Sequence, residues 1–401
     1  MHSKKLIALL AAAAMCCTAF TACGKKDPGD SSSGGTQSAA EDAKDRSQPE
    51  EMRDISSMEL CGEMKLCWNL GNALDVCNAD RDGDGKVNEH SENVDETLWG
   101  NVMTTPEVFE TLKADGYNAV RIPVTWRDHL DENYNIDESW MDRVQEVVDY
   151  AYDLDMYVII NLHHDGGGDP DFGAWIRETA MNDYDTWYAK YSSIWTQICE
   201  RFENYSDRLI FESMNEVGFD ELNTNDAYAL LNKMNQAFVD LVRSGGGNNP
   251  KRHLLIAGYW TDIDKSISNQ YVMPNDPENR CILSVHYYTP WEFCVCENQY
   301  EWGTDIEVRT MESQISKLKT NFIDKGIPVI IGEYGTGGNE PASVTFFCEK
   351  LTKLTHDIGI PAFLWDPGTI FNRETCTWNR ENFIPALQKA VSGEDYEVVK
   401  G

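Results

Sequence analysis

The sequence predicts a single (β/α)8 barrel behind an export signal and a flexible tether. Eight short, nearly continuous apolar runs follow one another between residues 64 and 365, as expected for strands buried on both faces of a parallel sheet. Amphipathic stretches separate the runs, and no glycine fingerprint of a doubly wound open sheet follows the first of them. Eight such units within residues 55–395 fit the size range of the barrel.

The predicted strands alternate with predicted helices along the whole domain. Val144, Val147, Val148, Ala151 and Leu154 fall on one helical face, and the stretches between the other runs show similar faces. Each strand is therefore followed by a helix that can cover the outside of the barrel. The predicted strands are residues 64–70, 119–124, 157–162, 209–214, 254–257, 282–285, 328–331 and 362–365.

The first 23 residues resemble a bacterial lipoprotein signal peptide. Lys4 and Lys5 form a basic start, and the apolar run over residues 6–20 is too short to span a membrane comfortably. The run ends in Phe-Thr-Ala-Cys, and the resemblance implies that Cys23 becomes the lipidated N-terminus. We expect an extracellular lipoprotein held at the cell surface, with the anchor at Cys23 as its membrane contact. Cleavage near Ala22 and secretion is the alternative.

Residues 24–54 form the predicted tether. They are rich in Gly, Ser, Asp, Lys and Gln, and such a segment cannot bury enough apolar surface to offset its conformational entropy. The predicted boundaries are therefore 1–23 for the signal peptide, 24–54 for a disordered linker and 55–395 for the barrel domain. A barrel on a flexible tether is expected to act as a monomer.

The chain is strongly acidic, with 67 acidic and 34 basic residues and a formal net charge of −33. Such a protein repels nucleic acid and anionic membrane surfaces, so we expect no nucleic-acid partner. A neutral polymer suits the charge better. The 12 cysteines form no paired metal-binding motif, and no disulfide pairs are assigned.

Polar and aromatic side chains follow most of the predicted strands, where barrel enzymes carry their chemistry. Arg121 lies within the second predicted strand, and Trp365 ends the eighth. A scaffold without a function would show mixed turn and capping residues at these places. Carboxylates, imidazoles and indoles occur there instead. In chain order the residues are Asn72, Arg121, His163, His164, Asn215, Glu216, Trp260, His286, Tyr288, Glu333 and Trp365.

Glu216 and Glu333 are the predicted catalytic pair. They end the fourth and seventh predicted strands, which face each other across the mouth of an eight-stranded barrel. Hydrolysis of a glycosidic bond needs two carboxyl groups, one to protonate the departing oxygen and one to attack the anomeric carbon or to activate water. A helix-capping or salt-bridged role is the alternative for either residue alone.

The ordered set of segments resembles glycoside hydrolase family 5. No single motif is diagnostic, but the motifs run in the family's order between residues 60 and 390. The matching stretches are Trp-Asn-Leu-Gly-Asn ending at Asn72, Arg-Ile-Pro-Val from Arg121, Asn-Leu-His-His-Asp around His163, Met-Asn-Glu ending at Glu216, His-Tyr-Tyr from His286, Gly-Glu-Tyr around Glu333, and Leu-Trp ending at Trp365.

The resemblance implies a retaining endo-β-1,4-glucanase that cleaves internal bonds of cellulose and related β-glucans by double displacement. It assigns Glu216 as acid/base and Glu333 as nucleophile, with no cofactor and no metal ligands in the catalytic site. The β-glucan polysaccharide or oligosaccharide is the expected partner. The expected substrate-binding residues are Asn72, Arg121, His163, His164, Asn215, His286, Tyr288 and Trp365, the last beneath a sugar ring.

Several alternatives share this catalytic frame. Xyloglucanase, mixed-linkage glucanase and β-mannanase remain open, and so does an inactive carbohydrate-binding surface lipoprotein. Retention predicts carboxyl groups about 5–5.5 Å apart, whereas a separation beyond roughly 6.5 Å favours inversion. Trp260, Trp291 and Trp365 are candidates for stacking on sugar rings, while Trp187 and Trp195 lie at helical spacing typical of the core.

An acidic loop beginning at Asp80 resembles the calcium loop of EF-hands and dockerins. Asp80, Asp82 and Asp84 hold positions one, three and five, and Gly85 permits the sharp turn at position six. The twelfth position is Ser91, where a bidentate carboxylate is expected. We therefore weigh a structural calcium site in this insertion against a solvated acidic turn.

Overall fold

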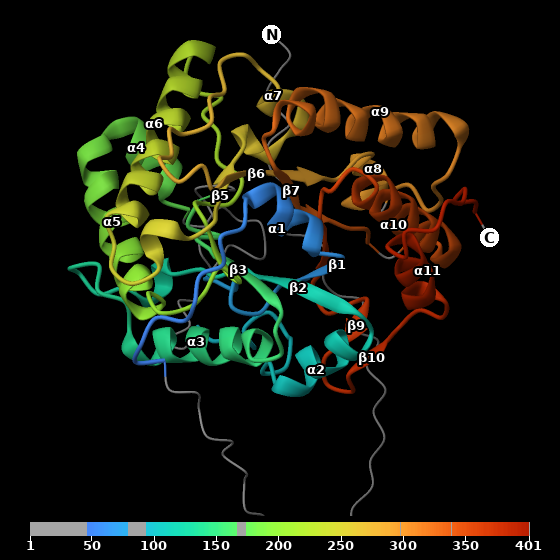
Figure 1. The fold of residues 1–401 in the computed structure, drawn as a ribbon, viewed down its shortest axis with the longest axis horizontal. Helices are drawn as coiled ribbons and strands as arrows, with labels where there is room; N and C mark the ends of the chain where they lie inside the picture. Colours follow the sequence, from blue (N-terminus) through green and yellow to red (C-terminus); the bar gives the residue numbers. More distant parts are fainter. Residues whose placement is uncertain (1–45, 79–93, 167–173, 297, 338, 401) are drawn as a thin grey trace, which may run out of the picture.

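The computed structural model describes residues 46–78, 94–166, 174–296, 298–337 and 339–400. Eight parallel strands pair in chain order, and β1 pairs with β8 to close the barrel. Helices surround the strands (Figure 1). The predicted (β/α)8 barrel is therefore confirmed. Within these ranges, no helix has the length and apolar character that crossing a membrane requires.

Each predicted apolar run forms one strand of the barrel. The boundaries shift by up to three residues, mainly because β6 and β7 continue past their apolar parts into polar residues that still pair with each other. The strands are β1 (Leu66–Leu70), β2 (Tyr117–Ile122), β3 (Tyr157–Asn161), β4 (Leu209–Glu212), β5 (Leu254–Ala257), β6 (Cys281–Tyr287), β7 (Val329–Tyr334) and β8 (Ala362–Asp366).

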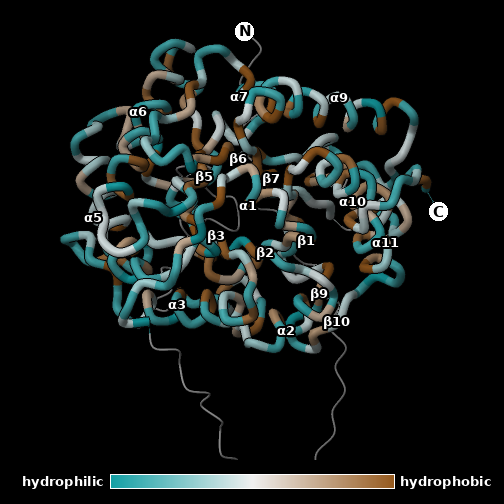
Figure 2. The backbone as a smooth tube through the Cα atoms, in the orientation of Figure 1, coloured by the Kyte–Doolittle hydropathy of each residue, from teal (hydrophilic) through white to brown (hydrophobic). Residues whose placement is uncertain are grey.

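The helices pack their apolar faces on the outside of the barrel. Val144, Val147, Val148 and Ala151 are fully buried in α3, as their spacing predicts. In Figure 2, hydrophobic and hydrophilic residues alternate along the helices that surround the strands. The longer helices are α2 (Pro106–Ala114), α3 (Glu138–Tyr152), α5 (Tyr184–Arg201), α6 (Thr224–Arg243), α9 (Asp305–Asn321), α10 (Pro341–His356) and α11 (Phe383–Ala390). The shorter ones are α1 (Ser57–Glu63), α4 (Ile176–Asn182), α7 (Ile263–Ser266) and α8 (Trp291–Cys294), and β9 (Phe371–Asn372) pairs with β10 (Thr377–Trp378).

The interior of the barrel is a separate apolar cluster. Each strand contributes an inward residue to it, for example Ala119, Ile210 and Ile330, all fully buried. Leu60 and Cys61 of α1 belong to the same cluster, so α1 covers the end of the barrel at which the strands begin. The opposite end, where the strands finish, is left for polar residues.

Residues 46–54 pack on the barrel, although the sequence placed them in the tether. The Glu50 backbone N–H donates to the Asn204 carbonyl at 2.8 Å, and Arg53 Nε donates to Asp207 Oδ2 at 2.8 Å. Arg46 forms ion pairs with Asp149 and Asp153 of the α3 region. The folded part of the chain therefore includes residues 46–54. Composition missed this contact because charged residues, rather than apolar ones, make it.

Several sequence predictions concern residues outside the described ranges or residues of the core. The signal peptide at 1–23, residues 24–45 of the tether and the acidic loop from Asp80 lie outside the described residues. Trp187 and Trp195 are fully buried in α5, which confirms their place in the core. The cysteines of the described chain are free thiols.

We expect Arg53→Ala to lower the free energy of unfolding by about 1–2 kcal/mol at neutral pH. The change leaves the Asp207 carboxylate, which is 2% exposed, without its cation. Burial raises the pKa of Asp207, but the bonds from Arg53 lower it below its ordinary value. A carboxyl group whose pKa is depressed by folding stabilises the folded state at pH values above its unfolded pKa. The difference in unfolding free energy between the wild type and Arg53→Ala should therefore shrink as the pH falls from the unfolded pKa of Asp207 through its folded pKa.

Urea denaturation at several pH values measures this effect, with Glu51→Ala as the control on an exposed neighbour. An Arg53→Ala protein as stable as the control at neutral pH would mean that the segment does not contribute to the fold.

Candidate active site

Glu216 and Glu333 meet at the end of the barrel where the strands finish. Glu333 lies within β7, and Glu216 follows β4 by four residues. One oxygen of each carboxylate and one ring nitrogen of His286 all lie within 4.8 Å of one another. The structure therefore brings the two predicted carboxyl groups to a common point.

The Glu333 carboxylate is bound by two donors. Arg121 Nη1 donates to Oε1 at 2.8 Å, and the Tyr288 hydroxyl donates to Oε2 at 2.9 Å. His163 Nε2 lies 4.0 Å from Oε1. Glu333 is 5% exposed, so these contacts fix a buried carboxylate whose negative charge both donors stabilise.

His286 joins the two glutamates. Its Nδ1 lies 2.8 Å from Glu216 Oε1 and 3.6 Å from Glu333 Oε2. Burial acts to lower the pKa of His286, but the charge of Glu333 and the hydrogen bond to Glu216 raise it above the ordinary value. The imidazole therefore carries a positive charge more readily than a free histidine and faces both carboxylates.

Irregularities in the backbone set the directions of the His286 and Glu216 side chains. The pairing register of β6 and β7 shifts between Val285 and His286, so that His286 pairs with Glu333. Such bulges re-aim side chains at barrel rims. Glu216 has φ 43°, a conformation that L-residues adopt at a cost and that is common at functional sites. The turn after β4 thus brings Glu216 to His286.

Arg121 is the centre of a buried network. Nη1 also approaches Asn69 Oδ1 at 3.1 Å, and Nη2 donates to Asn215 Oδ1 at 2.9 Å. Nε donates to Glu212 Oε2 at 2.6 Å, and all of Arg121 and Glu212 is buried. Since Asn215 uses its oxygen on Arg121, its amide N–H groups remain for other acceptors.

The sequence analysis assigned no role to Asn69 and Asn161, which stand in the quoted motifs, and did not single out Glu212 or Ser284. All four lie inside predicted strands, whereas the residues that were assigned to the site follow their strands, with Arg121 and Trp365 as the exceptions. A signal was present, because a charged residue in a strand buried on both faces requires an opposite charge. Glu212 and Arg121 occupy such positions in β4 and β2 and pair with each other.

His163, Trp365 and the turn after β1 form one side of the site. The rings of His163 and Trp365 stack with centroids 5.5 Å apart and an interplanar angle of 9°. A Cβ atom at Gly71 would lie 2.8 Å from the Trp365 ring, so glycine lets the turn approach the indole. Asn72 has φ 55° and accepts a bond from Asn101 on its carbonyl. Among the described contacts, none joins the Asn72 side chain to the glutamates.

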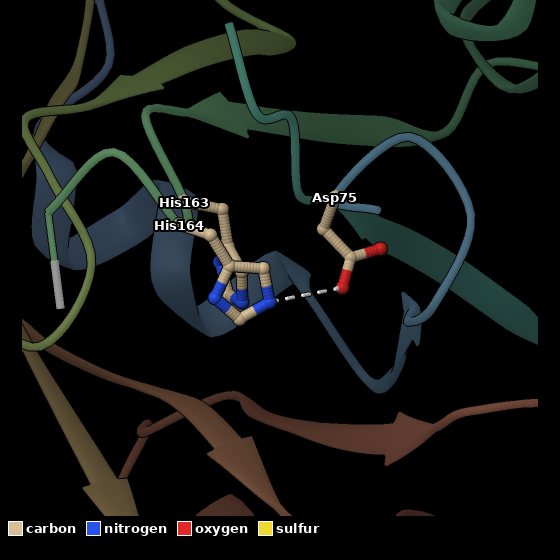
Figure 3. A group of neighbouring side chains, drawn as sticks. All are labelled: Asp75, His163 and His164. Atoms are coloured by element: carbon tan, nitrogen blue, oxygen red, sulfur yellow. Dashed lines mark ion pairs between the residues drawn. The ribbon is translucent and has the colours of Figure 1, made fainter. Parts of the chain in front are cut away.

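His164 lies beside His163 and faces Asp75, a further residue that sequence reasoning missed (Figure 3). His164 Nε2 is 3.8 Å from Asp75 Oδ2, and the two rings and this carboxylate offer ligand atoms within 4.8 Å of one another. Burial lowers the pKa of His164 to about 3 and raises the pKa of Asp75 to about 6. His164 is therefore a neutral imidazole at neutral pH.

The donor set of Asp75, His163 and His164 does not suit a metal. Asn161 Oδ1 accepts from the Val124 backbone, so its amide nitrogen faces His163 Nδ1 at 3.2 Å as a donor. This assigns the His163 proton to Nε2 and leaves the ring without a free lone pair. The cluster Glu216, His286 and Glu333 also has ligand atoms within 4.8 Å, but its groups already bond to one another and to Arg121 and Tyr288.

Two other predicted aromatic residues lie near the rim. The Trp260 ring lies against Gly218, two residues after Glu216, and Arg177 covers it at 4.5 Å from the ring centroid. Trp260 is therefore close to the chain that carries Glu216. Trp291 begins α8 and is 39% exposed.

The family model that matches the chain is "Cellulase (glycosyl hydrolase family 5)", over residues 81–369. Endoglucanase A of Ruminococcus albus is 37% identical over 361 residues, which are 84% of this chain and 93% of the relative. A xyloglucan-specific endo-β-1,4-glucanase of Bacteroides ovatus is 33% identical over 373 residues, 85% of this chain and 71% of the relative. The cellulase/esterase CelE of Acetivibrio thermocellus is 35% identical over 364 residues, 86% of this chain, which spans only 41% of that relative.

Solved structures give the same result. A broad-specificity endoglucanase from Ruminococcus champanellensis with bound cellotriose superposes with a TM-score of 0.74 at 32% sequence identity. The match covers 85% of this chain and 99% of that chain. The similarity therefore extends over the whole barrel rather than over the site alone.

We expect Glu333→Gln to lower the pKa of His286. The charge of Glu333 is a main cause that raises this pKa against the effect of burial, and glutamine removes the charge while keeping the shape. Nuclear magnetic resonance of the imidazole nitrogens measures the titration. Glu132→Gln, on an exposed glutamate, is the control and should leave it unchanged. A His286 that titrates at the same pH in both variants would show that Glu333 is not its electrostatic partner.

Proposed function

We propose that this chain, which belongs to glycosyl hydrolase family 5 and is a glycoside hydrolase of the endoglucanase type, is a retaining endo-β-1,4-glucanase. Its proposed substrates are cellulose and related β-glucans, which it cleaves by double displacement. The observation that carries the proposal is the approach of one oxygen of Glu216 to one oxygen of Glu333 within 4.8 Å. This closeness is typical of retaining enzymes, whose carboxyl groups lie about 5–5.5 Å apart, and leaves little room for the water that inversion needs.

In the first step the ionised Glu333 attacks the anomeric carbon. The glycosidic C–O bond breaks, and Glu216 gives its proton to the departing oxygen. Arg121 and Tyr288 hold the attacking carboxylate in place through bonds of 2.8 and 2.9 Å. The products of this step are a glycosyl ester on Glu333, a carboxylate on Glu216 and a released chain end.

In the second step Glu216 acts as the base. It takes a proton from water, the water oxygen attacks the anomeric carbon, and Glu333 leaves as a carboxylate. His286 contacts both carboxylates, so a charge on either one has a partner throughout the cycle. The free amide N–H of Asn215 supports a bond to the sugar 2-hydroxyl, which strengthens in the transition state.

The proposal also concerns which β-glucan the enzyme prefers. The cellotriose in the R. champanellensis structure supports a β-1,4-glucan backbone, and the B. ovatus relative keeps a branched xyloglucan open. The ring stack of Trp365 on His163, beside Glu333, supports a platform for a sugar ring.

A substrate panel tests this specificity. Carboxymethylcellulose, barley β-glucan, xyloglucan and mannan are incubated with the protein, and reducing ends and product sizes are measured. The proposal expects release from the first two with a range of product lengths. Activity on mannan alone would contradict glucan specificity, and no release from any polymer would favour a carbohydrate-binding surface protein without activity.

The two glutamates should respond differently to substitution. Glu333→Gln should abolish turnover of all substrates, because no nucleophile remains. Glu216→Gln should lower kcat on cello-oligosaccharides by on the order of 10²–10⁴-fold, yet retain formation of the glycosyl-enzyme from aryl cellobiosides whose leaving group needs no proton. Glu132→Gln should match the wild type.

Proton nuclear magnetic resonance of early products supplies the stereochemical readout. The proposal expects the β-anomer first. An α-anomer as the first product would establish inversion, and near-normal rates in Glu333→Gln would remove Glu333 from its role.

We also propose that the protein is a monomeric cell-surface lipoprotein attached through Cys23. The signal-like sequence supports the anchor. Arg53 and Glu50 run beside residues that precede β4, so the described chain enters at the end of the barrel opposite the catalytic glutamates. Cys23→Ser should release activity into the medium, and an unchanged membrane fraction would refute the anchor.

The acidic loop from Asp80 is proposed as a structural calcium site, on the sequence pattern alone. Calcium bound to the folded state would raise the melting temperature by mass action. Dialysis against EDTA should lower the melting temperature, and added Ca²⁺ should restore it. An unchanged melting temperature would favour the solvated acidic turn.

A further inference from the structure

Glu212 is a fully buried carboxylate beneath the catalytic pair. It is the last residue of β4, and its side chain is 0% exposed. Its oxygens accept three bonds, from Arg121 Nε at 2.6 Å, Asn161 Nδ2 at 3.0 Å and Ser284 Oγ at 2.9 Å. A carboxylate with this many donors is held in one orientation.

The Arg121 guanidinium lies between Glu212 and Glu333. Nε points to Glu212, Nη1 to Glu333 Oε1 at 2.8 Å and Nη2 to Asn215 at 2.9 Å. Because the guanidinium is planar and rigid, the bond at Nε sets the direction of the other two. One buried positive charge is therefore divided between two buried carboxylates.

We propose that Glu212 is a positioning residue that acts on the nucleophile through Arg121, an inference that rests on the proposed function. By occupying Nε, Glu212 directs a single N–H of Arg121 to Glu333 Oε1. It also prevents Arg121 from binding that carboxylate through two N–H groups at once. Its negative charge also offsets part of the Arg121 field at Glu333. Arg121 thus holds the nucleophile without stabilising its carboxylate so strongly that it loses reactivity.

The other groups around Glu333 do not replace this contribution. The charged and titratable groups that face it are Arg121 from β2, His163 after β3, Glu216 after β4, and His286 and Tyr288 from the β6 side. Of these, Glu216 is the other carboxylate, and it must carry a proton for the first step. Apart from Glu333 itself, the carboxylate that pairs with Arg121 among the described residues is therefore Glu212.

Glu212→Gln tests the proposal because it removes the charge and keeps the shape. The glutamine oxygen can accept from Arg121 and Asn161, and the Ser284 hydroxyl can turn to accept from the new amide. With the offsetting charge gone, Arg121 attracts the Glu333 carboxylate more strongly, and Glu333 attacks more weakly. We expect the acid limb of kcat/KM for an aryl cellobioside to move down by about one pH unit. We also expect kcat to fall by about tenfold or more.

Ser284→Ala is the matched control, because it removes one bond to Glu212 and leaves the charge. It should keep the wild-type acid limb. Melting curves and titration of active sites with a covalent 2-fluoro glycoside count the folded, competent molecules in each preparation. A Glu212→Gln enzyme whose acid limb and kcat match those of Ser284→Ala would overturn the proposal and leave Glu212 a structural residue.

Glu212→Asp covers the case in which Glu212→Gln does not fold. The shorter side chain keeps the charge but withdraws it from Arg121 Nε. The proposal expects a lower kcat with a retained acid limb, whereas an unchanged kcat would overturn it. A wild-type protein without activity on aryl cellobiosides or β-glucans would instead refute the proposed function itself, which separates the two failures.

Discussion

The site depends on one buried cation. Arg121 is fully buried at the mouth of the barrel, and a charge without water needs partners of opposite sign. It finds them in Glu212 of β4 and Glu333 of β7, at 2.6 and 2.8 Å. Strands far apart in the sequence are thus joined through one guanidinium, and the direction of the Glu333 carboxylate follows from it. Removal of any partner leaves a buried charge unbalanced, which makes the network a constraint on both fold and chemistry.

The barrel supplies the rigidity that this network needs. Strands buried on both faces hold Arg121, His286 and Glu333, and a register shift between β6 and β7 sets the last two side by side. Sites built on strands are held more closely than sites on loops. Glu216 is the exception, since it lies after β4 in a left-handed conformation and no strand pairing holds it. Its contact with His286 at 2.8 Å holds its carboxylate instead.

Hydrophobic pattern and strand order made most of the fold predictable from sequence. Eight apolar runs became eight strands, and the position just beyond each run identified both glutamates, His286 and Tyr288. The same rule failed for Glu212, because a polar residue inside a strand was counted with its apolar neighbours. It failed for Asp75, which lies in a turn and whose closeness to His164 depends on tertiary structure. The boundary at residue 54 failed because ion pairs of Arg53, and not apolar burial, dock the segment.

In the proposed reaction, Glu333 is the group that becomes covalently bound to sugar. The most direct measurement is mass spectrometry of peptides after reaction with an activated 2-deoxy-2-fluoro cellobioside, which forms the glycosyl-enzyme but slows its hydrolysis. We expect one added 2-deoxy-2-fluorocellobiosyl group on the peptide that contains Glu333, and its loss when a cello-oligosaccharide acceptor is supplied. A label on Glu216, or active enzyme that never acquires a label, would contradict it.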